Sequence, residues 1–157
     1  ALFTASELPV AAIALVALGA IILVKDNRRA LLVIHGLVGM GFALVGAATL
    51  AFQAGLIAPL TWMIATGAGV YVAYTPFNAM LFDRLVAYSG RIATAGFLIY
   101  IADASGYVGS VALLLWKNFG VVNMNWVQFF TLSAYATSLI GMGAVAAAGI
   151  YFARRKA

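Results

Sequence analysis

Apolar runs of about 20 residues, the length that spans a bilayer as an α-helix, constrain this chain more than any other feature. Five such runs cover residues 8–24, 30–53, 60–81, 93–116 and 126–152. Only 8% of the 157 residues are charged, whereas a soluble domain carries about 25%. So few charges cannot cover a surface that faces water. The sequence therefore predicts one domain, an all-α integral membrane bundle of five transmembrane helices that contacts the lipid bilayer.

The distribution of basic residues predicts the orientation of the bundle. Eight of the nine lysines and arginines lie at one end of the expected helices, and only Lys117 lies at the other. The eight are Lys25, Arg28, Arg29, Arg84, Arg91, Arg154, Arg155 and Lys156. Because cytoplasmic loops are enriched in basic residues, we expect an outside N-terminus, a cytoplasmic C-terminus and a location in a bacterial inner membrane. No basic stripe with interleaved aromatic residues is present, so nucleic acid is not expected as a partner.

An aspartate interrupts the fourth apolar run, in the stretch YIADASGY. Asp103 follows Ala93 by ten residues, which places it about 15 Å along a helix and near the midplane of the membrane. A charged aspartate there costs about 2.5 kcal/mol or more, so its side chain should face protein or a water-filled cavity. Tyr100 and Tyr107 lie one turn away on the same helix face. The three residues are candidates for substrate binding or proton coupling; the alternative is a structural hydrogen bond between helices.

Two further polar positions lie inside apolar runs. Pro76, in the stretch YTPFN, removes a backbone donor and should kink or loosen the third helix. Asn78 could then line a cavity, because interrupted helices often mark transporter sites; a purely structural kink is the alternative. His35, near the cytoplasmic end of the second helix, is a candidate proton shuttle. The alternative for His35 is a hydrogen bond to a neighbouring helix.

Catalytic and metal-binding patterns are missing from the sequence. The acids are Glu7, Asp26, Asp83 and Asp103, and the first three belong at the membrane ends. No nucleophile stands near a base, and no metal-ligand spacing or phosphate loop is present. We therefore expect no enzyme activity, no metal and no cofactor.

Several stretches of the chain resemble known membrane families. The segment VKDNRRAL, with Asp26, Arg28 and Arg29, resembles the loop between the eighth and ninth helices of major facilitator superfamily transporters. That resemblance implies a half-transporter fold, the eighth to twelfth helices, with a cytoplasmic gate held by these residues and by Asp83 and Arg84 of the next loop. The stretches FTASELPV, YTPFNAMLFDR and GFLIYIADASGYVGSVALLLWKNF are similar to an uncharacterised facilitator-like family.

Two functions follow from these expectations. The first is part of a secondary transporter that moves a small solute by alternating access, with protonation of Asp103 as the coupling event. A facilitator needs two six-helix halves, so the missing half is then the expected partner. The second is a non-catalytic subunit of a larger membrane complex, whose polar face around Asp103 docks on another membrane subunit.

Overall fold

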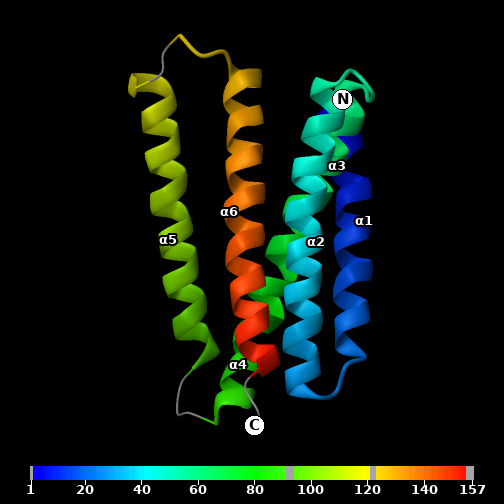
Figure 1. Cartoon of the computed structure of the whole chain (residues 1–157), viewed down its shortest axis with the longest axis vertical. Coiled ribbons are helices and arrows are strands. Elements are labelled where there is room, and N and C mark those ends of the chain that lie inside the picture. Colours follow the sequence, from blue (N-terminus) through cyan, green and yellow to red (C-terminus); the bar gives the residue numbers. More distant parts are fainter. Residues whose placement is uncertain (1, 91–93, 121–122, 155–157) are drawn as a thin grey trace.

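The computed structural model describes residues 2–90, 94–120 and 123–154, which form helices joined by short turns. Figure 1 shows long helices running along a common direction, connected at the two ends of the molecule. Their bounds are α1 Leu2–Ile22, α2 Asn27–Gln53, α3 Pro59–Pro76, α4 Phe82–Ser89, α5 Ala95–Leu115 and α6 Trp126–Arg154. Two π-helical segments follow α3 and α5, namely η1 Phe77–Leu81 and η2 Trp116–Gly120. The expected all-α fold is confirmed for this part of the chain.

Three of these helices are long and apolar enough to cross a membrane. They span Asn27–Gln53, Ala95–Gly120 and Trp126–Arg154, and a shorter apolar helix covers Glu7–Ile22. A helix rises 1.5 Å per residue, so each of the three exceeds the thickness of the hydrocarbon core. The chain thus has the helices of a membrane protein, while five crossings and a bacterial inner membrane stay predictions.

Helix α2 forms the centre of the packing, with α3 and α6 against it and α1 against α3. Glycines allow α2 and α3 to approach closely. A Cβ atom added to Gly41 would lie 2.5 Å from the carbonyl oxygen of Gly69, and one added to Gly69 would lie 2.7 Å from the carbonyl oxygen of Gly41. Since no side chain fits there, small residues set the distance between these helices, as is typical of membrane bundles.

Helix α5 lies at the edge of the bundle and buries none of its residues. Figure 1 shows it at the left, connected to the rest through α4 and through the loop that precedes α6. The glycines Gly96, Gly106 and Gly109 have open space where a Cβ atom would be. The glycines of α5 therefore do not serve the packing of this chain, in contrast to those of α2 and α3.

The segment after the third apolar run was expected to be a loop, and this prediction was wrong for residues 82–89. Phe82–Ser89 form α4, an amphipathic helix with Asp83 in its first turn. Leu85 and Val86 are half-buried, whereas Asp83 is exposed, so Asp83 lies on the outer face of the helix. The helix ends at Gly90, whose φ of 61° is left-handed and favours glycine. Arg91 and the expected start of the fourth run at Ala93 lie outside the described residues.

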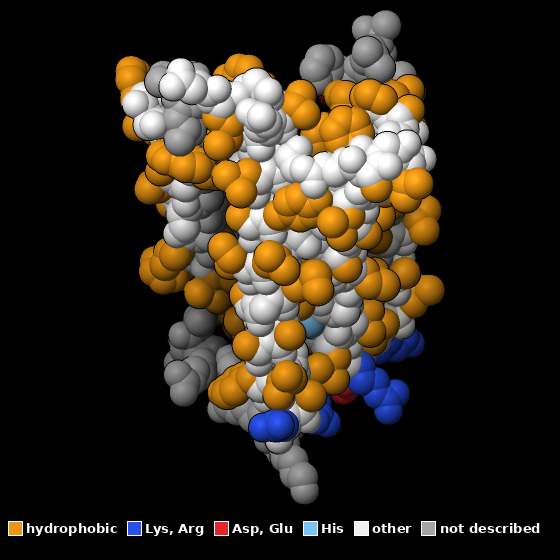
Figure 2. All heavy atoms as spheres, turned by 45° about the horizontal axis from the view of Figure 1, so that its top comes forward, with side chains coloured by type: hydrophobic (Ala, Val, Ile, Leu, Met, Phe, Trp, Pro, Cys, Tyr) orange, Lys and Arg blue, Asp and Glu red, His pale blue; other side chains and the backbone are white. Residues whose placement is uncertain are grey.

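The basic residues gather at one end of the molecule. Figure 2 shows the lysine and arginine side chains at the lower end, below a largely apolar surface. Of the eight residues expected there, Arg91, Arg155 and Lys156 lie outside the described residues. Lys117 lies at the opposite end and is only 6% exposed, with its ammonium 5.0 Å from the centre of the Trp126 ring. The charge asymmetry supports the predicted orientation, which itself stays a prediction.

Candidate functional site

The structure brings Asp103 together with Asn78, which lies on another helix. The amide Nδ2 of Asn78 donates a hydrogen bond of 3.4 Å to Asp103 Oδ1, and a second of 2.6 Å to the hydroxyl of Tyr74. Asp103 is half-buried. The carboxylate therefore faces protein, as its cost in lipid requires, although most of the helix that carries it is exposed.

The position of Asn78 depends on the widened helical turn that follows Pro76. Proline has no N–H group and its ring crowds the preceding turn, so the regular hydrogen-bond ladder is lost there. Pro76 is buried, and the chain continues directly into the π-helix Phe77–Leu81. Wider π-helical turns occur inside α-helices and frequently mark functional sites. The helix thus widens after Pro76, and Asn78 lies in the widened turn.

A pocket of about 380 Å³ lies beside this hydrogen bond. It is lined by Tyr74, Phe77, Ala102, Asp103, Gly106, Tyr107 and Ser110. A carboxylate, two phenol hydroxyls and one serine hydroxyl provide hydrogen-bonding groups, and an aromatic ring and small residues form the remaining walls. A pocket of this kind suits a small polar molecule or a cation. Among the described residues, no three metal-ligating side chains lie together.

The structure brings together some of the residues predicted for this site and leaves others apart. Asp103 and Tyr107 line the pocket, and Asn78 bonds Asp103. Tyr100 does not line the pocket and is 79% exposed. Tyr74 was missed, although it lies four residues before Asn78 and such pairs share a helix face.

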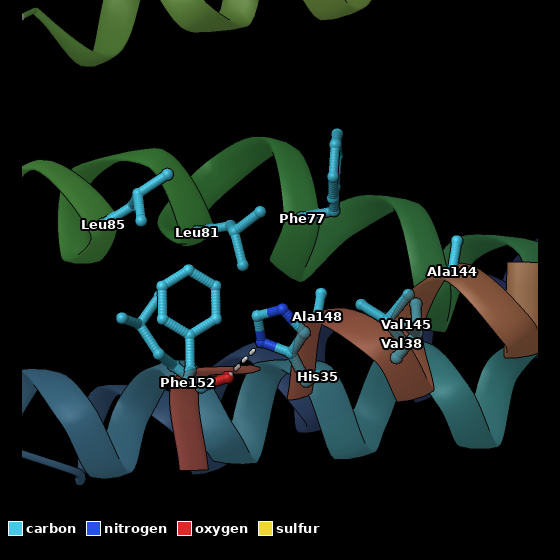
Figure 3. Close-up of a pocket in the computed structure, with 10 residues that line it drawn as sticks. His35, Val38, Phe77, Leu81, Leu85, Ala144, Val145, Ala148 and Phe152 are labelled. Carbon is cyan, nitrogen blue, oxygen red and sulfur yellow. Dashed lines mark hydrogen bonds between the residues drawn. The ribbon is translucent and has the colours of Figure 1, made fainter. Parts of the chain in front are cut away.

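His35 lies in a different pocket and is not part of the Asp103 site. Its Nδ1 atom is 2.7 Å from the carbonyl oxygen of Leu31, one turn earlier on α2. Figure 3 shows this bond and the imidazole among apolar side chains of α2, α6 and the segment from Phe77 to Leu85. The expected hydrogen bond to a neighbouring helix was therefore wrong, because the histidine bonds its own helix.

Of the five gate candidates, Arg28 and Arg84 connect helices at the basic end. Asp26 is the N-cap of α2 and accepts a hydrogen bond of 2.7 Å from the backbone N–H of Arg29. Arg28 donates to the carbonyl oxygen of Ala153 in the last turn of α6. Such a bond satisfies a carbonyl that lacks a partner within its helix.

Arg84 connects α4 to the turn before α2. Its Nη1 atom donates to Asn27 Oδ1 at 2.9 Å and to the carbonyl oxygen of Lys25 at 3.3 Å. The side chain of Asp83 is exposed. These contacts hold α2, α4 and α6 together at one end, which a cytoplasmic gate also requires; the gating role itself stays a prediction.

Replacing the N-cap Asp26 by alanine is expected to lower the free energy of unfolding by about 1 kcal/mol, because the N–H of Arg29 loses its acceptor. Unfolding by increasing fractions of SDS in mixed micelles measures this change. Asp26→Asn is the matched control, since asparagine caps as well as aspartate. If both variants lose the same free energy of unfolding, Asp26 stabilises the protein through its charge and not through its capping hydrogen bond.

Comparison with known proteins identifies one family. No curated protein and no solved structure matches the chain significantly. The match found is to a family model described as a family of unknown function, DUF5690, and it covers residues 1–155. It agrees with the expected resemblance to an uncharacterised family and carries no link to the major facilitator superfamily. The chain therefore belongs to the DUF5690 family.

Proposed function

We propose that this chain is part of a membrane transporter that moves a small polar solute, with Asp103 as the substrate-binding or proton-coupling group. The hydrogen bond between Asn78 and Asp103, beside a pocket at a loosened helix turn, carries the proposal. Intramembrane carboxylates commonly mark substrate and proton pathways. The proposed topology has five crossings of a bacterial inner membrane, with the N-terminus outside and the C-terminus in the cytoplasm.

The hydrogen-bond pattern indicates what the pocket would recognise. The two amide hydrogens of Asn78 are used by Asp103 Oδ1 and by the hydroxyl oxygen of Tyr74. Since Tyr74 accepts this bond, its own hydrogen is available to a ligand. When ionised, the carboxylate of Asp103 offers acceptors only. A fitting solute thus carries a donor or positive group for Asp103 and an acceptor for Tyr74.

Helix α5 is the element that we propose to move during alternating access. None of its residues is buried, and the glycines Gly106 and Gly109 near Asp103 have no neighbour where a Cβ atom would be. Moving α5 would therefore break few packed contacts, whereas moving α2 against α3 would disrupt close ones. The sequence resemblance favours transport by a facilitator-like mechanism. In this form of the proposal, a second half supplies the other wall of the pathway.

Solute-driven proton entry tests the proposal. The native protein is reconstituted in vesicles that contain the pH-sensitive dye pyranine, and small sugars, amino acids and carboxylates are added outside in turn. We expect at least one class to acidify the interior, and Asp103→Asn to reduce this signal to that of empty vesicles. Glu7→Gln removes an exposed acid that belongs to neither the Asp103 site nor the gate candidates and serves as the control. Unchanged coupling in Asp103→Asn would contradict the role of Asp103.

The exposure of α5 also favours a second function, a non-catalytic subunit of a larger membrane complex. A helix that is long enough to span the membrane yet buries no residue is available to pack against another membrane protein. A photoreactive residue placed at Gly109 should then crosslink to a partner chain that co-purifies at fixed stoichiometry in mild detergent. Native mass spectrometry showing the chain without a partner, combined with active transport, would exclude this function.

A further inference from the structure

A second pocket, around His35, is separate from the Asp103 site and has different chemistry. It has a volume of about 270 Å³ and lies between α2, α6 and the segment formed by η1 and α4. Figure 3 shows its walls, in which every lining side chain except His35 is apolar. The lining residues are Leu31, His35, Val38, Phe77, Leu81, Leu85, Ala144, Val145, Ala148 and Phe152. Only Phe77 is shared with the Asp103 pocket.

The hydrogen bond of His35 determines which polar group the pocket offers. A carbonyl oxygen can only accept, so Nδ1 of His35 carries the proton that is donated to Leu31. In the neutral imidazole, Nε2 is then a bare acceptor. Nε2 has no hydrogen bond to any of the described residues. In Figure 3 this nitrogen points away from α2, into the space below Phe77 and Leu81.

The chemistry of the walls argues against water and against hydrocarbon as the occupant. A buried water needs two to four polar partners, and this pocket offers one. A lipid tail fits the apolar walls but would cover Nε2 without donating to it, and an acceptor that is covered without a donor is unfavourable. A charged or strongly polar solute would lose its hydration without compensation.

From this geometry we infer that the His35 pocket binds a small, largely apolar molecule that carries one hydrogen-bond donor, most simply a hydroxyl group. The apolar body packs between Leu81, Val145 and the ring of Phe152, which lies 5.5 Å from the His35 ring. The hydroxyl donates to Nε2. Such molecules partition into membranes, so the bilayer supplies them to a pocket between helices that are long enough to span it.

The single histidine of the chain gives a direct test. Protein labelled with ¹⁵N-histidine in nanodiscs is titrated with 4-propylphenol, and in parallel with propylbenzene, which has the same shape without the hydroxyl. We expect the phenol to shift the Nε2 resonance saturably and to bind roughly fivefold more tightly than propylbenzene, the gain of one hydrogen bond. Equal affinity of the two compounds, or no saturable shift with either, would overturn the inference.

Variants connect the signal to the pocket. Ala148→Phe fills the pocket and should abolish the saturable shift, while Ala147→Phe changes a neighbouring, exposed residue and should leave it intact. Ala144→Phe, one turn earlier on the same wall of the pocket, replaces Ala148→Phe if that variant does not fold. In His35→Phe, the greater thermal stabilisation by the phenol over propylbenzene should disappear. A shift that survives both filling substitutions would place the binding elsewhere and overturn the inference.

Discussion

Replacing Gly41 by valine is expected to prevent α2 and α3 from packing and to destabilise the bundle by about 3 kcal/mol or more, at the upper end of overpacking effects. An added Cβ atom would lie 2.5 Å from the carbonyl oxygen of Gly69 and 2.8 Å from the backbone N of Ala73. Both neighbours are backbone atoms, so relief requires movement of a whole helix. The midpoint of thermal unfolding in detergent, followed by size-exclusion fluorescence, should fall sharply or the variant should not be recovered as a folded monodisperse protein.

The matched control is Gly109→Val, which makes the same change in the middle of α5. No atom lies within 4 Å of the added Cβ position there, and the change in helix propensity is the same as at Gly41. We expect a stability close to that of the unchanged protein. If both variants lose stability equally, propensity rather than the close approach of α2 and α3 is responsible.

The parts of the fold that were predictable from sequence are those that depend on the membrane alone. Long apolar runs separated by charged turns predicted the helices, and α2 ends at Gln53 as expected. Asp103 was selected as a candidate because a carboxylate inside an apolar run needs a partner. Both arguments use the free-energy cost of transferring groups from water into lipid. This cost can be estimated without knowing which helices contact each other.

The relation between helices was not predictable in the same way. Counting residues along a regular helix gives the faces of α2 and α5, but the π-helix Phe77–Leu81 has a wider turn, so the face of every later residue is rotated. The hydrogen-bond partner of Asp103 is Asn78, on a different helix, and the spacing of residues along one helix does not predict such a pair. Likewise, the bond from His35 to Leu31 depends on the rotamer of His35 and not on its spacing.

The π-helical segment also connects the two pockets. Phe77 lines both the Asp103 pocket and the His35 pocket, and Asn78 follows it directly. A ligand beside His35 would therefore contact the same widened turn that positions the donor for Asp103. Since π-helical turns are less regular than α-helical ones, this segment is where the occupancy of one pocket would affect the geometry of the other.

Exchanging Asp103 and Asn78 is expected to distinguish a functional carboxylate from a structural hydrogen bond. Asp103→Asn alone should lose coupled proton entry, and Asn78→Asp alone should place two acids on atoms now 3.4 Å apart, where like charges repel. The double variant, Asp103→Asn with Asn78→Asp, restores one acid and one amide across the same gap. We therefore expect the double variant to recover part of the pyranine signal and the stability lost in Asn78→Asp. If the double variant recovers stability but no coupling, although the pocket is intact, the carboxylate must lie on α5 itself. If coupling is the same in all four proteins, Asp103 only joins two helices.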